Sequence, residues 1–254
     1  MADPGNDRAL QRFHEVADAV GEHLATVTDW GESGLRRGQY AADVGADEIA
    51  VEMLVTSGFA VLSEESGRRG PDAAAVVVLD PLDGSTNASR GVPWFATALC
   101  LLDDGGPAVA LVANQASGER WWAERDGGAW RGSPSAPVAL APSACQRPGE
   151  AIVGISGPPG RDYGWAQFRA FGAAALDLCL VAAGVLDAYV DMSPDAHGVW
   201  DYLAGALICR EAGAVVDDAF GRDLAVVDHA ARRTPVAAAT PELLAALLAV
   251  RSGR

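Results

Sequence analysis

The sequence has 254 residues, half of them hydrophobic, which is enough for one large domain or for two fused lobes with a sizeable core. Its formal net charge is −15, and it contains arginine but no lysine, so nucleic acid and anionic membrane surfaces are poor partners for it. The four cysteines are widely spaced and form no Cys-x-x-Cys pair, which argues against a disulfide framework or a zinc site.

We expect a soluble protein of a reducing, cytoplasmic compartment. The chain opens with no basic and apolar leader, and no uninterrupted apolar run reaches the ~18 residues of a membrane-spanning helix. The acidic surface would repel a phosphorylated substrate unless a local cation offset that field, so the charge favours a metal in any phosphate site.

Two amphipathic helices are predicted in the first part of the chain. Hydrophobic residues recur at helical spacing over 6–30, with Asp3 or Asn6 as the cap, and again over 43–57. A short strand is expected at 58–62.

Two adjacent glutamates, Glu64 and Glu65, directly follow this strand. Such a pair usually lies on an exposed loop. Here the next predicted strand, at 73–79, ends beside Asp80, and consecutive elements are usually neighbours in space. The glutamates could therefore lie beside Asp80 at one edge of a sheet.

The stretch at 80–87, with the sequence Asp-Pro-Leu-Asp-Gly-Ser-Thr-Asn, carries the strongest chemical signal. Asp80 and Asp83 are about one turn apart, and carboxylates held so close repel each other unless a cation lies between them. Gly84 lets the backbone approach a ligand, and the N–H groups of the two hydroxyl residues after it could face a phosphate. A structural turn that caps a helix is the alternative. The layout favours metal-assisted phosphate chemistry.

The middle of the chain predicts β-structure. Two hairpins are expected, with strands at 95–102, 108–114, 119–124 and 128–130. Residues 133–149 are rich in Pro, Ser and Ala and are interpreted as an irregular link. We therefore expect an N-terminal α+β lobe at 1–140 and a C-terminal α/β lobe at 141–254.

The second half alternates strands and helices. Strands are expected at 151–156, 186–190 and 214–216, and helices at 162–171, 174–183 and 241–250. A further buried helix begins near Asp201. Asp201 either caps that helix or supplies a third metal carboxylate at its positive end.

Together these features resemble the inositol monophosphatase family of metal-dependent sugar phosphatases. The residues that carry the resemblance are Glu64-Glu65-Ser66, the stretch at 80–87, the segment from 171 to 189, and Trp200-Asp201 with the helix that ends at Glu211-Ala212-Gly213. The resemblance spans nearly the whole chain. It implies an α/β (α+β) fold, a layered αβαβα sandwich with the active site between two fused lobes, and a homodimer.

The resemblance also implies two Mg²⁺ ions. Glu64, Asp80 and the Leu82 carbonyl would hold the first ion, and Asp80, Asp83 and Asp201 the second. A third, weaker ion would rest on Glu64 through waters. Ligand sets made only of oxygen suit Mg²⁺ better than zinc.

Catalytic roles follow from the same resemblance. Asp47, with the Ser85 hydroxyl, would orient and deprotonate the water that the metal activates, and Glu65 would act from the outer shell. Asp191 would hold substrate hydroxyls. Backbone groups would hold the phosphate and border the substrate at Gly84, Ser85, Thr86, Gly172, Ala173 and Ala174.

Three departures from the family pattern lie on the sugar side of the pocket. Val44 replaces the threonine that is usual three residues before the catalytic aspartate, and Arg36 stands where a lysine is common. Roughly three extra residues, within 192–198, separate Asp191 from the Trp-Asp motif, and His197 lies among them. Substrate identity is therefore less determined than hydrolysis.

The sequence predicts a Mg²⁺-dependent phosphomonoesterase for a small phosphorylated substrate, inositol monophosphate or a similar polyol or sugar phosphate. Histidinol phosphate, fructose 1,6-bisphosphate and phosphoadenosine nucleotides are alternatives on the same scaffold. A non-catalytic metal- or phosphate-binding protein is the rival from another class. An aspartyl-nucleophile phosphatase is disfavoured, because Asp80 and Asp83 are spaced Asp-x-x-Asp rather than Asp-x-Asp.

Overall fold

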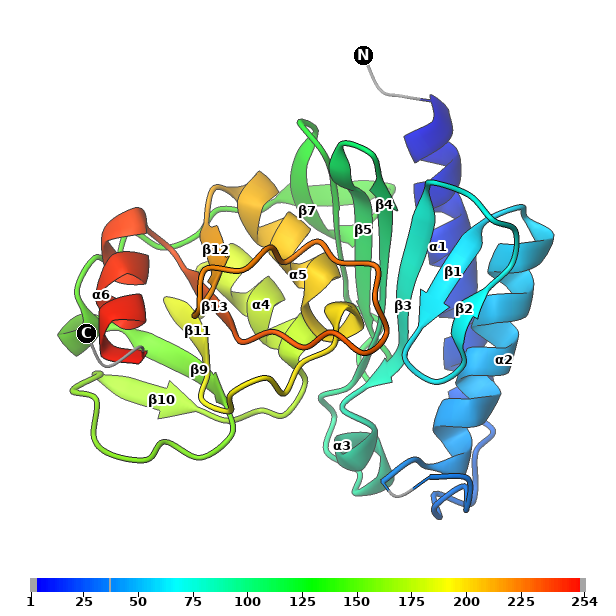
Figure 1. Ribbon diagram of the computed structural model, residues 1–254, viewed down its shortest axis with the longest axis horizontal. Helices are drawn as coiled ribbons and strands as arrows, with labels where there is room; N and C mark the ends of the chain where they lie inside the picture. Colours follow the sequence, from blue (N-terminus) through cyan, green and yellow to red (C-terminus); the bar gives the residue numbers. More distant parts are fainter. Residues whose placement is uncertain (1–3, 37, 252–254) are drawn as a thin grey trace.

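The computed structural model describes residues 4–36 and 38–251. Two β-sheets and their helices stack in alternating layers (Figure 1). From right to left in this view the order is a helix pair, the first sheet, a second helix pair, the second sheet and a last helix. The expected αβαβα sandwich is confirmed. None of the described helices is both long enough and apolar enough to span a bilayer.

Helices α1 (Pro4–Leu24) and α2 (Ala41–Thr56) form the first layer and pack on the outer face of the first sheet. A buried stripe that includes Phe13, Val16 and Val20 recurs at helical spacing and holds α1 there. The first helix is shorter than predicted: it ends at Leu24, six residues before its predicted end at Trp30. Asn6 lies inside the helix rather than capping it, and Asp3 lies outside the described residues.

The first sheet has the strand order β2-β1-β3-β4-β5-β6-β7-β8. Only β1 and β3 run parallel, and the other neighbours are antiparallel. Its strands are β1 (Ala60–Ser63), β2 (Gly67–Arg69), β3 (Val76–Asp83), β4 (Ala96–Asp103), β5 (Gly106–Asn114), β6 (Arg120–Glu124), β7 (Gly128–Ser133) and β8 (Ala136–Ala139). Both predicted hairpins are confirmed, as β4–β5 and β6–β7. The edge strands β2 and β8 were not predicted, because one is mostly arginine and the other contains a proline and no buried residue.

The second sheet has the strand order β10-β9-β11-β13-β12. Its strands are β9 (Ile152–Ser156), β10 (Gln167–Arg169), β11 (Ala188–Asp191), β12 (Val215–Asp218) and β13 (Pro235–Ala238). The helix predicted over 162–171 is wrong. Part of that range is β10, which pairs in parallel with β9. Gly164 has a φ of +70°, which lies outside the right-handed helical region. The short, alanine-rich β13 was not predicted.

Helices α4 (Ala174–Ala182) and α5 (Val199–Ala212) fill the layer between the two sheets (Figure 1). Nearly every residue of α5 up to Cys209 is buried, because a helix between two sheets has no face in water. Helix α6 (Pro241–Arg251) covers the far side of the second sheet. The shorter helices are α3 (Ser85–Ser89) and the 3₁₀ turn η1 (Pro148–Glu150).

The two-lobe division at 140/141 stays a prediction. It separates the strands of the two sheets, since β8 ends at Ala139 and β9 begins at Ile152. However, α4 and α5 follow the division in sequence and share one buried core with the inner face of the first sheet. Neither sheet therefore has a complete core without these two helices.

Candidate metal and phosphate site

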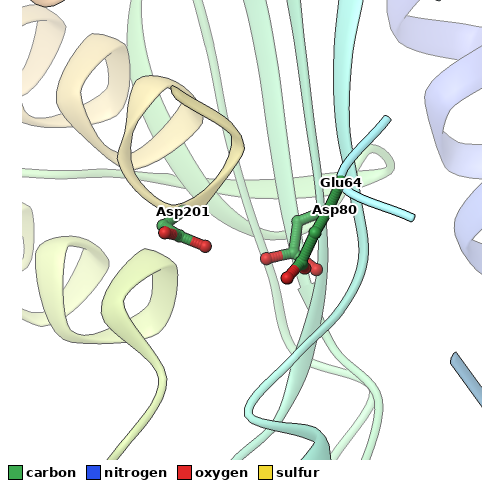
Figure 2. Close-up of side chains that lie close together, drawn as sticks. All are labelled: Glu64, Asp80 and Asp201. Atoms are coloured by element: carbon green, nitrogen blue, oxygen red, sulfur yellow. The ribbon is translucent and has the colours of Figure 1, made fainter. Parts of the chain in front are cut away.

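Three carboxylates from separate elements meet between the first sheet and α5. Glu64 directly follows β1, Asp80 lies in the neighbouring strand β3, and Asp201 lies in the first turn of α5. One ligand oxygen of each lies within 4.8 Å of the others. Figure 2 shows Glu64 and Asp80 side by side and Asp201 facing them from the helix. We expected the turn that carries Glu64 to lie beside Asp80, and the parallel pairing of β1 with β3 brings the two together.

Burial and mutual repulsion make these carboxylates unfavourable as anions. Burial, and then the charge of its neighbours, raises the pKa of Glu64 and of Asp80 well above the usual range. Burial, followed by the repulsion of Asp201, raises the pKa of Asp83 to about 8. A divalent cation would offset this repulsion, so the donor set fits a hard metal ion.

Backbone N–H groups orient the acidic side chains. Leu82 donates to Asp80 Oδ1 over 3.0 Å, Gly198 to Asp201 Oδ2 over 2.8 Å, and Ala175 to Asp83 Oδ2 over 2.8 Å. Strand β3 continues past its predicted end at Leu79, with an irregular register between Asp80 and Asp83. These contacts hold the carboxylates toward the centre of the molecule despite their charge.

Gly84 permits a close approach of two segments at this centre. Its φ is +84°, and a Cβ there would meet the Trp94 carbonyl oxygen at 2.9 Å and the Ala173 Cβ at 3.1 Å. The predicted phosphate turn, which continues into Ser85 and Thr86 at the start of α3, therefore lies against the predicted substrate segment 172–174.

Asp47 and Glu65 are linked to each other through the Ser63 side chain, at the end of β1. Ser63 Oγ donates a hydrogen bond to Asp47 and accepts one from the Glu65 N–H over 3.2 Å. Glu65 also pairs with Arg36 over 2.8 Å and accepts a hydrogen bond from Gln39. Asp47 and Glu65 border a groove beside α2, and that groove does not include Ser85.

Asp43 is the acidic residue of α2 that faces Ser85, and the sequence analysis missed it. Burial raises the pKa of Asp43 to about 6, while the Tyr40 N–H and the Ser85 hydroxyl act in the opposite direction. Asp43 Oδ2 accepts the Tyr40 N–H over 2.8 Å, and Oδ1 is buried without a hydrogen-bond partner among the described residues. The signal for Asp43 was present, because it lies one helical turn before Asp47 and shares its face.

A cavity of about 220 Å³ opens beside the carboxylates. It is lined by Asp83, Ile155, Ser156, Gly172, Ala173, Ala174, Asp177, Tyr189, Ala196, His197 and Asp201. Burial raises the pKa of Asp177 to about 7, and its carboxylate accepts a hydrogen bond of 2.9 Å from the Trp94 indole. Asp191, the predicted contact for substrate hydroxyls, is fully buried and is not among the lining residues.

The loop between β12 and β13 reaches from the second sheet to the Glu64 turn (Figure 1). His229 Nε2 donates a hydrogen bond of 2.9 Å to the Glu64 carbonyl oxygen. The His229 ring packs on Trp200, with 4.7 Å between centroids, and Arg232 lies 5.2 Å from the centre of the Trp200 ring. The sequence of this loop shows neither helical nor strand periodicity, so the contact between His229 and Glu64 was not predicted.

Known proteins are similar to this chain in sequence and in fold. The model of the inositol monophosphatase family matches residues 39–253. A protein of Archaeoglobus fulgidus named fructose-1,6-bisphosphatase/inositol-1-monophosphatase is 32% identical over 229 residues, with 85% of this chain and 86% of the relative covered. An inositol-1-monophosphatase of Rhizobium meliloti is 36% identical over 199 residues, covering 71% of each chain.

A solved structure has the same arrangement of layers. The extragenic suppressor protein suhB of Bartonella henselae superposes with a TM-score of 0.81 at 27% identity, and the match covers 96% of this chain and 98% of that one. The family match, the relatives and the shared fold agree with the acidic centre described above. The chain therefore belongs to the inositol monophosphatase family of phosphoric monoester hydrolases.

Proposed function

We propose that this protein is a Mg²⁺-dependent phosphomonoesterase that hydrolyses inositol monophosphate or a similar polyol phosphate. The observation that carries the proposal is the cluster of Glu64, Asp80 and Asp201 oxygens within 4.8 Å of one another, next to a cavity of about 220 Å³. The names of the relatives support the same substrate class.

Glu64, Asp80, Asp83, Asp201 and the Leu82 carbonyl would hold two metal ions, and a third, weaker ion would rest on Glu64. Bound there, Mg²⁺ would neutralise the phosphate charge and lower the pKa of a water. The chain's own contribution is to keep the carboxylates of Asp80, Asp83 and Asp201 oriented, since their N–H partners do not depend on the metal.

The residues at the turn after β3 would bind the phosphate. Gly84 allows the backbone to approach the ligand, and the N–H groups of Ser85 and Thr86 follow it at the start of α3. Three N–H donors can hold the phosphate oxygens in one orientation without adding a charged side chain.

We assign the general base to Asp43 rather than to Asp47. Asp43 faces the Ser85 hydroxyl and has a buried oxygen without a partner among the described residues, whereas Asp47 accepts a hydrogen bond from Ser63. A carboxylate with a pKa of about 6 is deprotonated near neutral pH and still basic enough to accept a proton. Asp47 and Glu65 would then support the turn that carries Glu64.

Phosphate release from inositol 1-phosphate, with and without Mg²⁺, tests this function. Wild type should release phosphate only with Mg²⁺, and Asp83→Asn should abolish the release. Asp43→Asn should lower kcat by about 10²–10⁴-fold, whereas the matched variant Asp47→Asn should retain most activity.

The same assay should include other phosphate esters. Fructose 1,6-bisphosphate belongs in the panel because the Archaeoglobus fulgidus relative is named for both substrates. No release from any ester by a folded, Mg²⁺-binding protein would favour the non-catalytic binding protein. The proposed homodimer is checked separately, by light scattering of the full chain.

A further inference from the structure

A histidine between β11 and α5 faces the cavity beside the metal carboxylates. His197 lines the cavity together with Asp83 and Asp201. It lies within the residues that depart from the family spacing, so the family pattern alone does not assign it a role. The ring is mostly buried, at 9% exposure, so the cavity is the place where it meets a ligand.

Asp191 is not available to a substrate in this arrangement. Its side chain has no exposed surface, and both of its oxygens have partners. Oδ1 accepts the Ser193 N–H over 2.8 Å, and Oδ2 lies 2.9 Å from His197 Nδ1. A ligand hydroxyl could bond Asp191 only by displacing a contact that is already buried.

Contacts on several sides hold the His197 ring in place. Its Nδ1 faces Asp191, and its backbone makes two hydrogen bonds with Arg233, of 3.3 Å and 2.9 Å. Nε2 lies 3.4 Å from the Tyr189 hydroxyl, which is long for a hydrogen bond to nitrogen. With the Nδ1 proton donated to Asp191, Nε2 is the ring atom left to accept a further proton donor.

We propose that His197 contacts a substrate hydroxyl in this enzyme, and that Asp191 is a positioning residue that acts through it. The proposal rests on the proposed function. A carboxylate would accept hydrogen bonds from two neighbouring hydroxyls, whereas the imidazole accepts one. The substrate class is therefore a small phosphate monoester with at least one hydroxyl near the ester. A second, neighbouring hydroxyl on the substrate adds little to its affinity.

Kinetics with two substrates test the contact. Inositol 1-phosphate has hydroxyls beside the ester, and phenyl phosphate has none. His197→Asn places an amide near the position of Nδ1, against Asp191, and leaves no acceptor at the position of Nε2. It should raise KM for inositol 1-phosphate about fivefold to tenfold, as expected for one lost hydrogen bond, and change kcat/KM for phenyl phosphate less than twofold. An equal loss on both substrates would contradict the proposal. His14→Asn, on the remote helix α1, is the matched histidine control.

A double-mutant cycle tests the role of Asp191. Asp191→Asn should raise KM for inositol 1-phosphate as His197→Asn does, and should add nothing when His197→Asn is already present. Additive effects would show that Asp191 meets the substrate directly and would overturn the assignment.

A spectroscopic readout keeps the test independent of turnover and of the folding of the variants. The chain contains four histidines, so ¹⁵N-histidine labelling gives few resonances to assign in wild type. The Nε2 resonance of His197 should shift on addition of inositol 1-phosphate with Ca²⁺ in place of Mg²⁺, and should not shift with phenyl phosphate. An unshifted resonance at saturating inositol 1-phosphate would refute the contact. If wild type hydrolyses no ester and yet the resonance shifts, only the proposed function fails.

Discussion

At the scale of single residues, hydrogen-bond partners decide which buried acidic groups can do chemistry. Asp43 and Asp47 are both buried on one face of α2, one turn apart. Asp47 accepts a hydrogen bond from Ser63, whereas Asp43 keeps one oxygen without a partner among the described residues and faces Ser85. Helical spacing places both residues on the same face, and only their contacts with Ser85 and Ser63 distinguish them.

The raised pKa of Asp43 predicts the acidic limb of the pH–rate profile. A general base works deprotonated, so kcat/KM should fall as the pH falls through about 6. The Arg36 charge lowers the pKa of Asp43, so Arg36→Gln should move the limb to higher pH. Initial rates at saturating Mg²⁺ from pH 5 to 8 measure the acidic limb in wild type and in Arg36→Gln. A limb that moves to lower pH in Arg36→Gln would exclude Asp43 as the base.

The buried carboxylates also predict how Mg²⁺ acts on stability. Removing the charge of Asp80 relieves repulsion with Glu64, Asp83 and Asp201, so Asp80→Asn should be more stable than wild type in EDTA. Wild type should gain about 2.7 kcal/mol when Mg²⁺ is raised to 100 times its Kd, and Asp80→Asn should gain much less. Urea unfolding with and without Mg²⁺ checks this. Asp104→Asn, on the exposed β4–β5 turn, is the control and should behave as wild type.

At the scale of elements, close packing of helices and one long loop position the site. Helix α5 carries Asp201 and is buried against α4 and both sheets. The loop at 219–234 joins the second sheet to the Glu64 turn through His229. The metal ligands therefore depend on contacts between segments that are far apart in the sequence.

Gly205 lets α4 and α5 approach each other. A Cβ at this position would meet the Leu178 Cβ at 2.6 Å and the Ala175 carbonyl oxygen at 3.2 Å. Gly205→Ala should therefore destabilise the protein by about 1–3 kcal/mol, although alanine favours a helix by about 1 kcal/mol. Urea unfolding measures the change. Leu178→Ala removes the Cδ1 atom that the new Cβ would meet at 2.9 Å, so the double variant should lose less stability than the sum of the two single changes. Unchanged stability of Gly205→Ala would show that the helices do not need this glycine.

The contact of His229 with the Glu64 carbonyl predicts an effect on metal binding. His229→Ala removes the donor, so the Glu64 turn should become less ordered and the affinity for Mg²⁺ should fall about tenfold. His229→Gln, which keeps an N–H donor, should lose less. Calorimetric titration with Mg²⁺ compares these variants with Asp228→Asn, an exposed neighbour that serves as the control. Equal affinity in all four proteins would show that the loop does not position Glu64.

At the scale of the whole molecule, the two sheets share one helix layer. The inner face of the first sheet packs on α4 and α5, which lie in the second half of the chain. A fragment that ended at the predicted boundary near residue 140 would expose that face to water. The predicted lobes are therefore units of topology, and we do not expect them to fold separately.

We accordingly predict one cooperative unfolding transition for the full chain. Tryptophans lie in the first sheet, as Trp121 does, and in the middle layer, as Trp200 does, so fluorescence reports on more than one layer. Urea curves followed by fluorescence and by far-UV circular dichroism should coincide. Two separated transitions, or a cooperatively folded fragment of residues 1–140, would contradict the shared core.

The sequence by itself determined the chemical character of this protein. The Asp-x-x-Asp-Gly turn, the glutamate pair and the Trp-Asp motif are local patterns, and they predicted the family, the layered fold and the carboxylates that the structure brings together. Long helices and tight hairpins were also predicted well, because their periodicity and turn residues act over short distances.

Only the tertiary structure decided which of several suitable side chains lies at each position of the site. Asp43 rather than Asp47 lies at Ser85, His197 covers Asp191, and His229 reaches Glu64 from 165 residues away. The short strands β8, β10 and β13 likewise form because neighbours supply their hydrogen bonds. Each of these outcomes depends on packing between distant segments, and a local pattern of residue types carries no record of that packing.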